Sequence, residues 1–153
     1  MSNKSGLGEL LHYVADLVDQ GSEKIYAQMD LNYRARYTPV LRAIDQGAIT
    51  ITSITTISKL TQSAISQSVA LMEKDGLIIK NTLSDARKSS LHLTDKGKNL
   101  IQKLKKHWEV IFTAITQLEQ DIGYPLLSIL EKTASALEQK SFDQRIKQIL
   151  NES

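Results

Sequence analysis

The most constraining feature of the chain is a seam of apolar residues near its middle, separated alternately by three and four positions. The seam consists of Ile101, Leu104, Trp108, Ile111, Ile115, Leu118 and Ile122. This is the heptad pattern of an α-helix that packs its seam on another helix. A helix from Asp95 to Asp121 would be about 40 Å long at 1.5 Å per residue, which is longer than the small domain before it is wide. About half of this helix therefore extends beyond that domain and must pack against another surface.

Amphipathic helices are also predicted at both ends of the chain. Residues 7–29 place apolar side chains at helical spacing. Gly123 and Pro125 interrupt the long helix, and the same spacing returns in residues 126–137 and 142–150. The ends of the chain are therefore expected to be helical, as is the seam between them.

The segment before the seam predicts short elements. Residues 38–39, a threonine and a proline, favour the start of a helix that ends near Gly47. The β-branched run at 49–51 favours a brief strand, after which Thr52 or Ser53 is expected to cap another helix.

A second helix and a hairpin complete this segment. Thr61 is a suitable N-cap for a helix over 62–74, and two β-prone stretches at 77–80 and 90–93 follow it. Thr94 is expected to cap the long helix. The fold predicted is mainly α with a small β-hairpin (α+β), a winged helix-turn-helix flanked by N- and C-terminal dimerisation helices.

The predicted helix over 62–74 has one face suited to DNA bases. Its residues that point away from the apolar side are Gln62, Ser63, Ser66, Gln67 and Ala70. Gln can pair with adenine, Ser can bond several bases and Ala can meet a thymine methyl, whereas a solvated face usually carries Glu and Lys. The alternative is a polar surface helix without a partner. Candidates for phosphate contacts are Ser53, Thr55 and Lys59.

The tip of the predicted hairpin favours the DNA-binding hypothesis. Arg87 and Lys88 lie side by side there, where an arginine can reach a narrow minor groove or a phosphate. Asp85 can orient the guanidinium or the turn. A charged tip can also be merely solvated, but its position shortly after the candidate recognition helix is typical of a wing.

The basic charge is concentrated in this middle segment. The whole chain has a formal net charge of +2, whereas residues 38–100 carry eight positive and five negative groups. Such a module would bind phosphates weakly by itself, so a useful affinity is expected to require two modules on one duplex.

Composition excludes several chemistries. The chain has no Cys and only three His, so thiol chemistry is excluded and neither a metal site nor a cofactor is expected. No paired carboxylates, Ser/His/Asp set or phosphate-binding loop is present, and the chain ends at Ser153 without a catalytic segment, so no enzyme is predicted. His12 and Asp16 interrupt the N-terminal apolar stripe, so no membrane segment is expected.

Several motifs resemble the MarR family of bacterial transcriptional regulators. They are residues 60–69 (LTQSAISQSV), 72–78 (MEKDGLI), 85–87 (DAR) and 93–97 (LTDKG). The resemblance covers essentially the whole chain. It implies a homodimer, interlocked through its terminal helices, that binds a pseudo-palindromic double-stranded DNA operator and is released by a small, often aromatic ligand. The family's cysteine-based peroxide sensors are excluded, since no thiol is present.

The resemblance also implies domain boundaries and a ligand pocket. Residues 1–37 would form the N-terminal dimerisation helix and connector, 38–94 the DNA-binding module and 95–153 the long and C-terminal dimerisation helices, in one intertwined domain. The family binds effectors between module and dimerisation helices. Candidates there are His12, Tyr13, Tyr33, Arg34, Arg36, Tyr37 and Trp108. Trp108 could instead be core or dimer interface, and Tyr33 and Tyr37 could pack the first helix on the module.

The function predicted is a homodimeric, sequence-specific DNA-binding regulator, a repressor released by a small aromatic or acidic ligand. It would be cytoplasmic and associated with the nucleoid when bound to DNA. The alternative is a winged-helix scaffold for protein contacts without sequence-specific DNA binding. The regulatory domain of an enzyme is a third hypothesis, which the missing catalytic segment disfavours.

Overall fold

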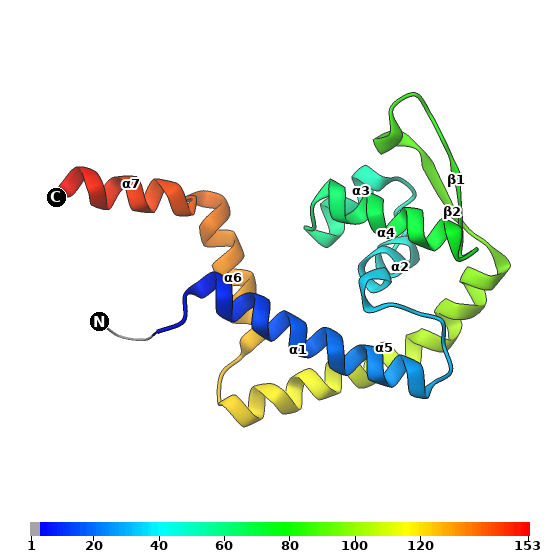
Figure 1. The fold of residues 1–153 in the computed structure, drawn as a ribbon, viewed down its shortest axis with the longest axis horizontal. Helices are drawn as coiled ribbons and strands as arrows, with labels where there is room; N and C mark the ends of the chain where they lie inside the picture. The colour runs from blue at the N-terminus through cyan, green and yellow to red at the C-terminus, as the bar shows by residue number, and fades with distance from the viewer. Residues whose placement is uncertain (1–3) are drawn as a thin grey trace. The chain divides into compact units, whose positions relative to one another are not determined.

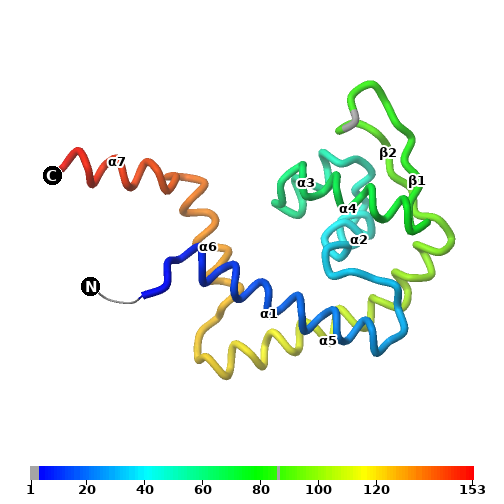
Figure 2. Tube along the Cα trace, viewed as in Figure 1, coloured from blue at the N-terminus to red at the C-terminus, as the bar shows by residue number. Residues whose placement is uncertain are grey.

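The computed structural model describes residues 4–153, so the first three residues of the predicted N-terminal segment lie outside the described residues. By its internal contacts the chain divides into two compact units, the first ending at Lys103 and the second spanning Leu104–Ser153. Figures 1 and 2 trace the two units, and each is described by itself below.

The first unit contains one long helix, several short helices and one hairpin. Its elements are α1 (Leu7–Gln28), the 3-10 helix η1 (Ala35–Tyr37), α2 (Thr38–Asp45), α3 (Ile51–Ser58), α4 (Gln62–Lys74), β1 (Ile78–Asn81), the 3-10 helix η2 (Ala86–Lys88) and β2 (Ser90–Leu93). The helix α5 (Asp95–Ile122) begins in this unit and continues into the second, which also holds α6 (Leu126–Gln139) and α7 (Phe142–Glu152). The predicted class, mainly α with a winged helix-turn-helix, is confirmed.

Helix α4 has the predicted bounds because its start and end are encoded locally. The hydroxyl of Thr61 accepts a hydrogen bond from the backbone N–H of Ala64 at 3.1 Å, as an N-cap does. Gly76, with φ of 75°, follows the last turn in the left-handed conformation that ends many helices. Three apolar residues of α4 are buried, namely Ile65, Val69 and Met72.

The predicted strand over residues 49–51 is wrong. Thr50 forms only an isolated bridge with Ser90, and α3 begins at Ile51. Thr50 is the N-cap, in place of the predicted Thr52 or Ser53, and forms a reciprocal capping box with Ser53. The capping box gives the backbone N–H groups of Thr50 and Ser53 hydrogen-bond acceptors on each other's side chains. These local bonds outweigh the preference of β-branched residues for strands.

Thr38 begins α2 but does not cap it with its side chain. A turn of 3-10 helix, η1, precedes α2. The hydroxyl of Thr38 instead shares a hydrogen bond of 2.6 Å with the phenol of Tyr33. Helix α2 ends at Asp45 with Gln46 as its C-cap, and Gly47, the predicted cap, follows one residue later with φ of 102°.

The hairpin pairs β1 and β2 in antiparallel register, from Ile78 opposite Leu93 to Asn81 opposite Ser90. Thr94 then caps α5 as predicted, because its hydroxyl accepts a hydrogen bond from the Gly97 backbone N–H at 3.1 Å and donates one to the Gly76 carbonyl at 2.6 Å. The start of α5 is thereby fixed to the end of α4.

Three tyrosines join α1 to the rest of the first unit. The rings of Tyr26 and Tyr33 meet edge to face with centroids 4.5 Å apart, and those of Tyr33 and Tyr37 do so at 5.9 Å. All three side chains are buried. Such edge-to-face pairs are favoured by the charge distribution of the rings. The C-terminal end of α1 is thus held in the core, whereas its N-terminal two-thirds expose their apolar residues.

The second unit exposes apolar side chains on every helix. No residue of α6 or α7 is buried. Large apolar side chains of this unit that are at least a third exposed include Leu118, Ile122, Leu127, Leu130, Ile146, Ile149 and Leu150. Along the heptad seam, Ile101 and Leu104 are buried, while Leu118 and Ile122 are 41% and 43% exposed. These helices lack the apolar contacts that their sequences are built to make.

Candidate nucleic-acid interface

Helix α4 presents the polar face that the sequence predicts. Gln62, Ser63, Gln67 and Ala70 are exposed and Ser66 is partly exposed. Met72 on the opposite face is fully buried. The exposed face therefore combines amide and hydroxyl groups with a single methyl group and carries no charged side chain between positions 62 and 70.

Two of the predicted phosphate-contact residues, Ser53 and Thr55, lie on α3, where their hydroxyls have partners, and the third, Lys59, follows it. The hydroxyl of Ser53 belongs to the capping box with Thr50, and that of Thr55 donates to the carbonyl of Ile51 at 2.9 Å. Lys59 is exposed and follows α3 with φ of 59°. Of these candidates, Lys59 is the one that offers a charge.

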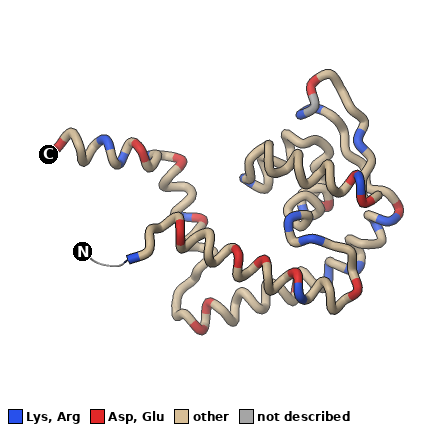
Figure 3. The backbone as a smooth tube through the Cα atoms, viewed as in Figure 1, with Lys and Arg blue, Asp and Glu red and all other residues tan. Residues whose placement is uncertain are grey.

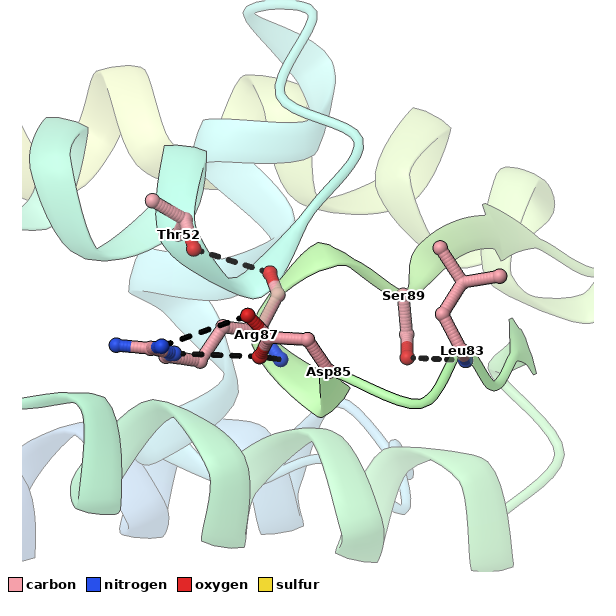
Figure 4. A network of polar contacts seen from close by, with 5 residues as sticks. All are labelled: Thr52, Leu83, Asp85, Arg87 and Ser89. Atoms are coloured by element: carbon pink, nitrogen blue, oxygen red, sulfur yellow. Dashed lines mark hydrogen bonds and ion pairs between the residues drawn. The ribbon is translucent and has the colours of Figure 1, made fainter.

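The hairpin tip is organised around the pair Asp85 and Arg87 (Figure 4). One oxygen of the Asp85 carboxylate accepts hydrogen bonds from the backbone N–H of Arg87 at 3.1 Å and from its Nε at 3.2 Å. Hydrogen bonds from Arg87, first from its side chain, keep the pKa of Asp85 below its usual value. The Arg87 side chain is 58% exposed, so it is oriented by the carboxylate and yet open to solvent.

Two further hydrogen bonds fix the tip (Figure 4). The hydroxyl of Thr52, on α3, donates to the backbone carbonyl of Arg87 at 3.0 Å, so the wing is attached to the helix-turn-helix. Across the base of the tip, the fully buried hydroxyl of Ser89 accepts a hydrogen bond from the backbone N–H of Leu83 at 2.9 Å. Thr52 was expected only as a possible cap of α3 and Ser89 was not expected to have a role, because both act through contacts that only the folded hairpin creates.

Charged residues of both signs occur along the chain and at the hairpin tip (Figure 3). The wing therefore is not a block of positive charge. Its one oriented guanidinium, that of Arg87, with Lys88 exposed beside it, is the basic feature that the tip offers to a phosphate or a minor groove.

The candidate ligand residues fall into different environments. His12, Tyr13 and Arg34 are exposed, whereas Tyr33 and Tyr37 are buried and contact each other. Burial raises the pKa of the Tyr33 phenol above its usual value. Trp108 is 8% exposed, and its Nε1 has no hydrogen-bond partner among residues 4–153. The tyrosines thus pack α1 onto the module, which was the structural alternative for them.

Arg36 and Tyr37 both contact α4 or its C-terminal end. The phenol of Tyr37 donates a hydrogen bond of 2.6 Å to the carboxylate of Asp75, the C-cap of α4. The guanidinium of Arg36 donates to Ser68 and Gln67. The connector between α1 and α2, which includes η1, is therefore linked to the candidate recognition helix. No local pattern in the sequence indicates this link.

The first unit also has an unpredicted cavity of about 460 Å³. It is lined by Asp30, Leu31, Asn32, Leu77, Lys96, Asn99, Leu100 and Lys103. One of its cations is engaged, because the ammonium of Lys96 donates to the backbone carbonyl of Asp75 at 2.8 Å. The cavity is formed by residues from three separate segments, and none of the predicted pocket residues lines it.

Among residues 4–153, no group of three or more His, Cys, Asp and Glu is placed to hold a metal ion. No described helix is both long and apolar enough to cross a membrane.

The comparisons with known proteins concern the fold. No protein-family model matches the chain, and no curated protein matches its sequence. Solved structures do match. A MarR/EmrR family transcriptional regulator from Acinetobacter sp. ADP1 is 19% identical with a TM-score of 0.62, over 86% of this chain and 94% of that one. BpsR of Bordetella bronchiseptica, whose DNA binding is regulated by 6-hydroxynicotinic acid, is 20% identical with a TM-score of 0.64, over 88% and 98%.

A third solved structure is MepR of S. aureus bound to DNA, which is 20% identical with a TM-score of 0.63, over 88% of this chain and 99% of that one. The chain therefore has a winged helix-turn-helix fold with flanking helices at both ends. More specifically, this is the fold of the MarR family transcriptional regulators, which the motifs around α4 and the wing had led us to expect.

Proposed function

We propose that the protein is a homodimeric, sequence-specific DNA-binding transcriptional regulator, and that it is a repressor released by a small aromatic or acidic ligand. The observation that carries the proposal is the pairing of an exposed, uncharged polar face on α4 with an oriented arginine on a wing anchored to α3. Amides and hydroxyls read base edges in the major groove, and an arginine at a wing tip binds phosphate or the minor groove.

The exposed apolar faces of the second unit support dimerisation. Leu118, Ile146 and Leu150 are 41%, 44% and 66% exposed, although each belongs to a helical apolar pattern. Apolar surface of this extent is typical of an interface. Two modules on one duplex would also compensate for the small positive charge of each, because the second module binds at a high effective concentration.

The ligand in this proposal is taken from the fold's relatives. DNA binding by BpsR is regulated by 6-hydroxynicotinic acid, an aromatic acid. For this chain we propose a ligand of the same chemical class, and the residues predicted for its pocket remain candidates.

Selection of bound fragments from random double-stranded DNA tests the proposal. The dimer should enrich a pseudo-palindromic motif, with half-sites about 34 Å apart. Affinity for the enriched fragment should fall steeply with salt, because phosphate neutralisation releases counterions. Titration of aromatic acids against the complex then tests for a ligand that releases the DNA.

Arg87→Ala tests the wing. It should weaken binding to many sequences and reduce the salt slope by about two, since each dimer loses two charges, whereas Lys24→Ala, which removes an exposed charge from α1, should leave the slope unchanged. An Arg87→Ala dimer that binds as well as the parent would overturn the wing assignment. If selection enriches no motif, the protein-contact scaffold becomes the better hypothesis.

A further inference from the structure

Arg36 reaches from η1 to two neighbouring residues of α4. Its Nε donates a hydrogen bond to the hydroxyl of Ser68 at 3.3 Å, and its Nη2 donates one to Oε1 of Gln67 at 3.4 Å. The two acceptors differ in exposure, since Ser68 is 4% exposed and Gln67 lies on the exposed face. The guanidinium thus spans the edge between the buried and the exposed side of the candidate recognition helix.

The backbone that carries Arg36 is anchored. The next residue, Tyr37, is fully buried, and its phenol donates to the carboxylate of Asp75. The guanidinium therefore starts from a fixed position, and its contact with Ser68 restricts it further.

This arrangement determines which way the Gln67 amide faces. A guanidinium has five N–H donors and no acceptor, so it can bind only the oxygen of an amide. With the oxygen turned toward Arg36, the NH₂ group of Gln67 lies on the other side of the amide. A free glutamine can present either end, because rotation about its last bond exchanges them.

We propose that Arg36 is a positioning residue that sets base preference through Gln67. The inference rests on the proposed function and adds to it the chemistry of one base contact. Because its NH₂ group is the end of the amide that faces away from Arg36, Gln67 should act as a donor to the base that it contacts. This favours guanine, whose N7 and O6 both accept, over adenine, which presents one acceptor, N7, beside the donor N6. The two-bond pairing of glutamine with adenine needs the oxygen as well, and is disfavoured.

The test compares the parent with Arg36→Met, which keeps most of the length of the side chain and removes its donors. Lys24→Met, on α1, is the control for the loss of one exposed positive charge. Fragments are selected from random double-stranded DNA, and the position read by Gln67 is the one whose preference disappears in Gln67→Ala. All variants are first compared with the parent by thermal unfolding and by dimer mass.

The parent should prefer guanine over adenine as the base that Gln67 contacts, and Arg36→Met should raise the relative affinity for adenine there about tenfold, the discrimination of one good base contact. Other positions should keep their preferences, as should Lys24→Met. In the Gln67→Ala background, Arg36→Met should have no further effect on base preference, since the group that it positions is absent.

A second measurement needs no DNA. The side-chain amide resonances of Gln67, identified by their loss in Gln67→Ala, should shift in Arg36→Met and stay unchanged in Lys24→Met. A Gln67 amide that does not respond to Arg36→Met would overturn the inference even if that variant bound DNA poorly.

Other outcomes separate the two proposals. If Arg36→Met weakens binding equally for all sequences and lowers the salt slope by about two, one for each protomer, Arg36 is a phosphate contact and the positioning role is wrong. If it keeps the parent's base preference, the inference fails and the proposed function stands. If the parent itself enriches no motif, the proposed function fails and this inference fails with it.

Discussion

The phenol of Tyr37 and the carboxylate of Asp75 are joined by a hydrogen bond of 2.6 Å between residues 38 positions apart. It links the connector after α1 to the C-cap of α4. Tyr37→Phe should lower the free energy of unfolding by about 1.5 kcal/mol, the lower end for a hydrogen bond to a charged group. Urea unfolding measures this. Tyr13→Phe, which removes a hydroxyl from an exposed side chain of α1, should change stability by less than about 0.5 kcal/mol.

The same pair predicts a pH dependence. Burial, together with the hydrogen bond and negative charge of Asp75, raises the pKa of Tyr37 to about 12. Below pH 10 this phenol is protonated in both the folded and the unfolded chain, so its contribution is constant. From pH 10 to 12 the unfolded chain releases a proton that the folded protein retains, so stability falls as pH rises.

Tyr37→Phe lacks this ionisation, so the stability difference between parent and variant should shrink between pH 10 and 11. A difference that stays constant, or grows, over this interval would contradict the raised pKa. Measuring both proteins at each pH cancels the contributions of the other tyrosines.

The sequence predicts α4 well because the determinants of that helix are local. Thr61 caps the helix three residues ahead, and Gly76 ends it with a positive φ. The failure at residues 49–51 has the opposite cause, since β-branched residues favour a strand in general but the Thr50–Ser53 capping box starts a helix at that place. Local hydrogen bonds that satisfy the backbone outweighed an average preference.

The environments of Arg36 and Tyr37 could not be predicted in this way. Their partners on and beyond α4 lie 31 to 38 residues along the chain. Neither spacing nor composition connects such pairs, so the sequence identified these residues as functional candidates without showing that they contact the recognition helix. The same holds for Thr52, which holds the wing through a residue 35 positions away.

Close packing accounts for Gly97, the last residue of the motif at residues 93–97 (LTDKG). A Cβ at this position would overlap the backbone carbonyl oxygen of Leu77, which already accepts a hydrogen bond from the Thr94 N–H. Gly97→Ala should therefore destabilise the protein by about 3 kcal/mol, despite the better helix propensity of Ala. Gly21→Ala in α1, where nothing lies within 4 Å of the new Cβ, should be neutral or stabilising by up to about 1 kcal/mol.

Chemical denaturation of the two alanine variants measures this contrast. Equal stability of Gly97→Ala and Gly21→Ala would show that the approach of α5 to Leu77 is looser than the structure has it.

Ser89 stabilises the base of the hairpin tip. Its fully buried hydroxyl accepts the Leu83 backbone N–H, so Ser89→Ala should cost about 1 kcal/mol of stability and speed hydrogen exchange at the Leu83 amide. Because the same tip presents Arg87, DNA affinity should fall as well. Ser84→Ala, at an exposed position of the tip, is the control and should change none of the three. Unchanged exchange at Leu83 in Ser89→Ala would contradict this role.

The exposed apolar residues of α7 predict how the dimer can be disrupted. Ile149 is 66% exposed in the single chain, and burying an aspartate in its place at an interface would leave a carboxylate without a partner. Ile149→Asp should therefore weaken the dimer at least about tenfold, equivalent to 1.4 kcal/mol. Asn151→Asp adds the same charge two residues further along α7 and should leave the dimer intact if Ile149 is in the interface. Sedimentation equilibrium at several concentrations measures the dimer dissociation constants of both variants.

DNA binding should weaken together with dimerisation in Ile149→Asp, because each module alone carries too little charge to hold the duplex. A dimer that tolerates Ile149→Asp as well as it tolerates Asn151→Asp would place the interface elsewhere.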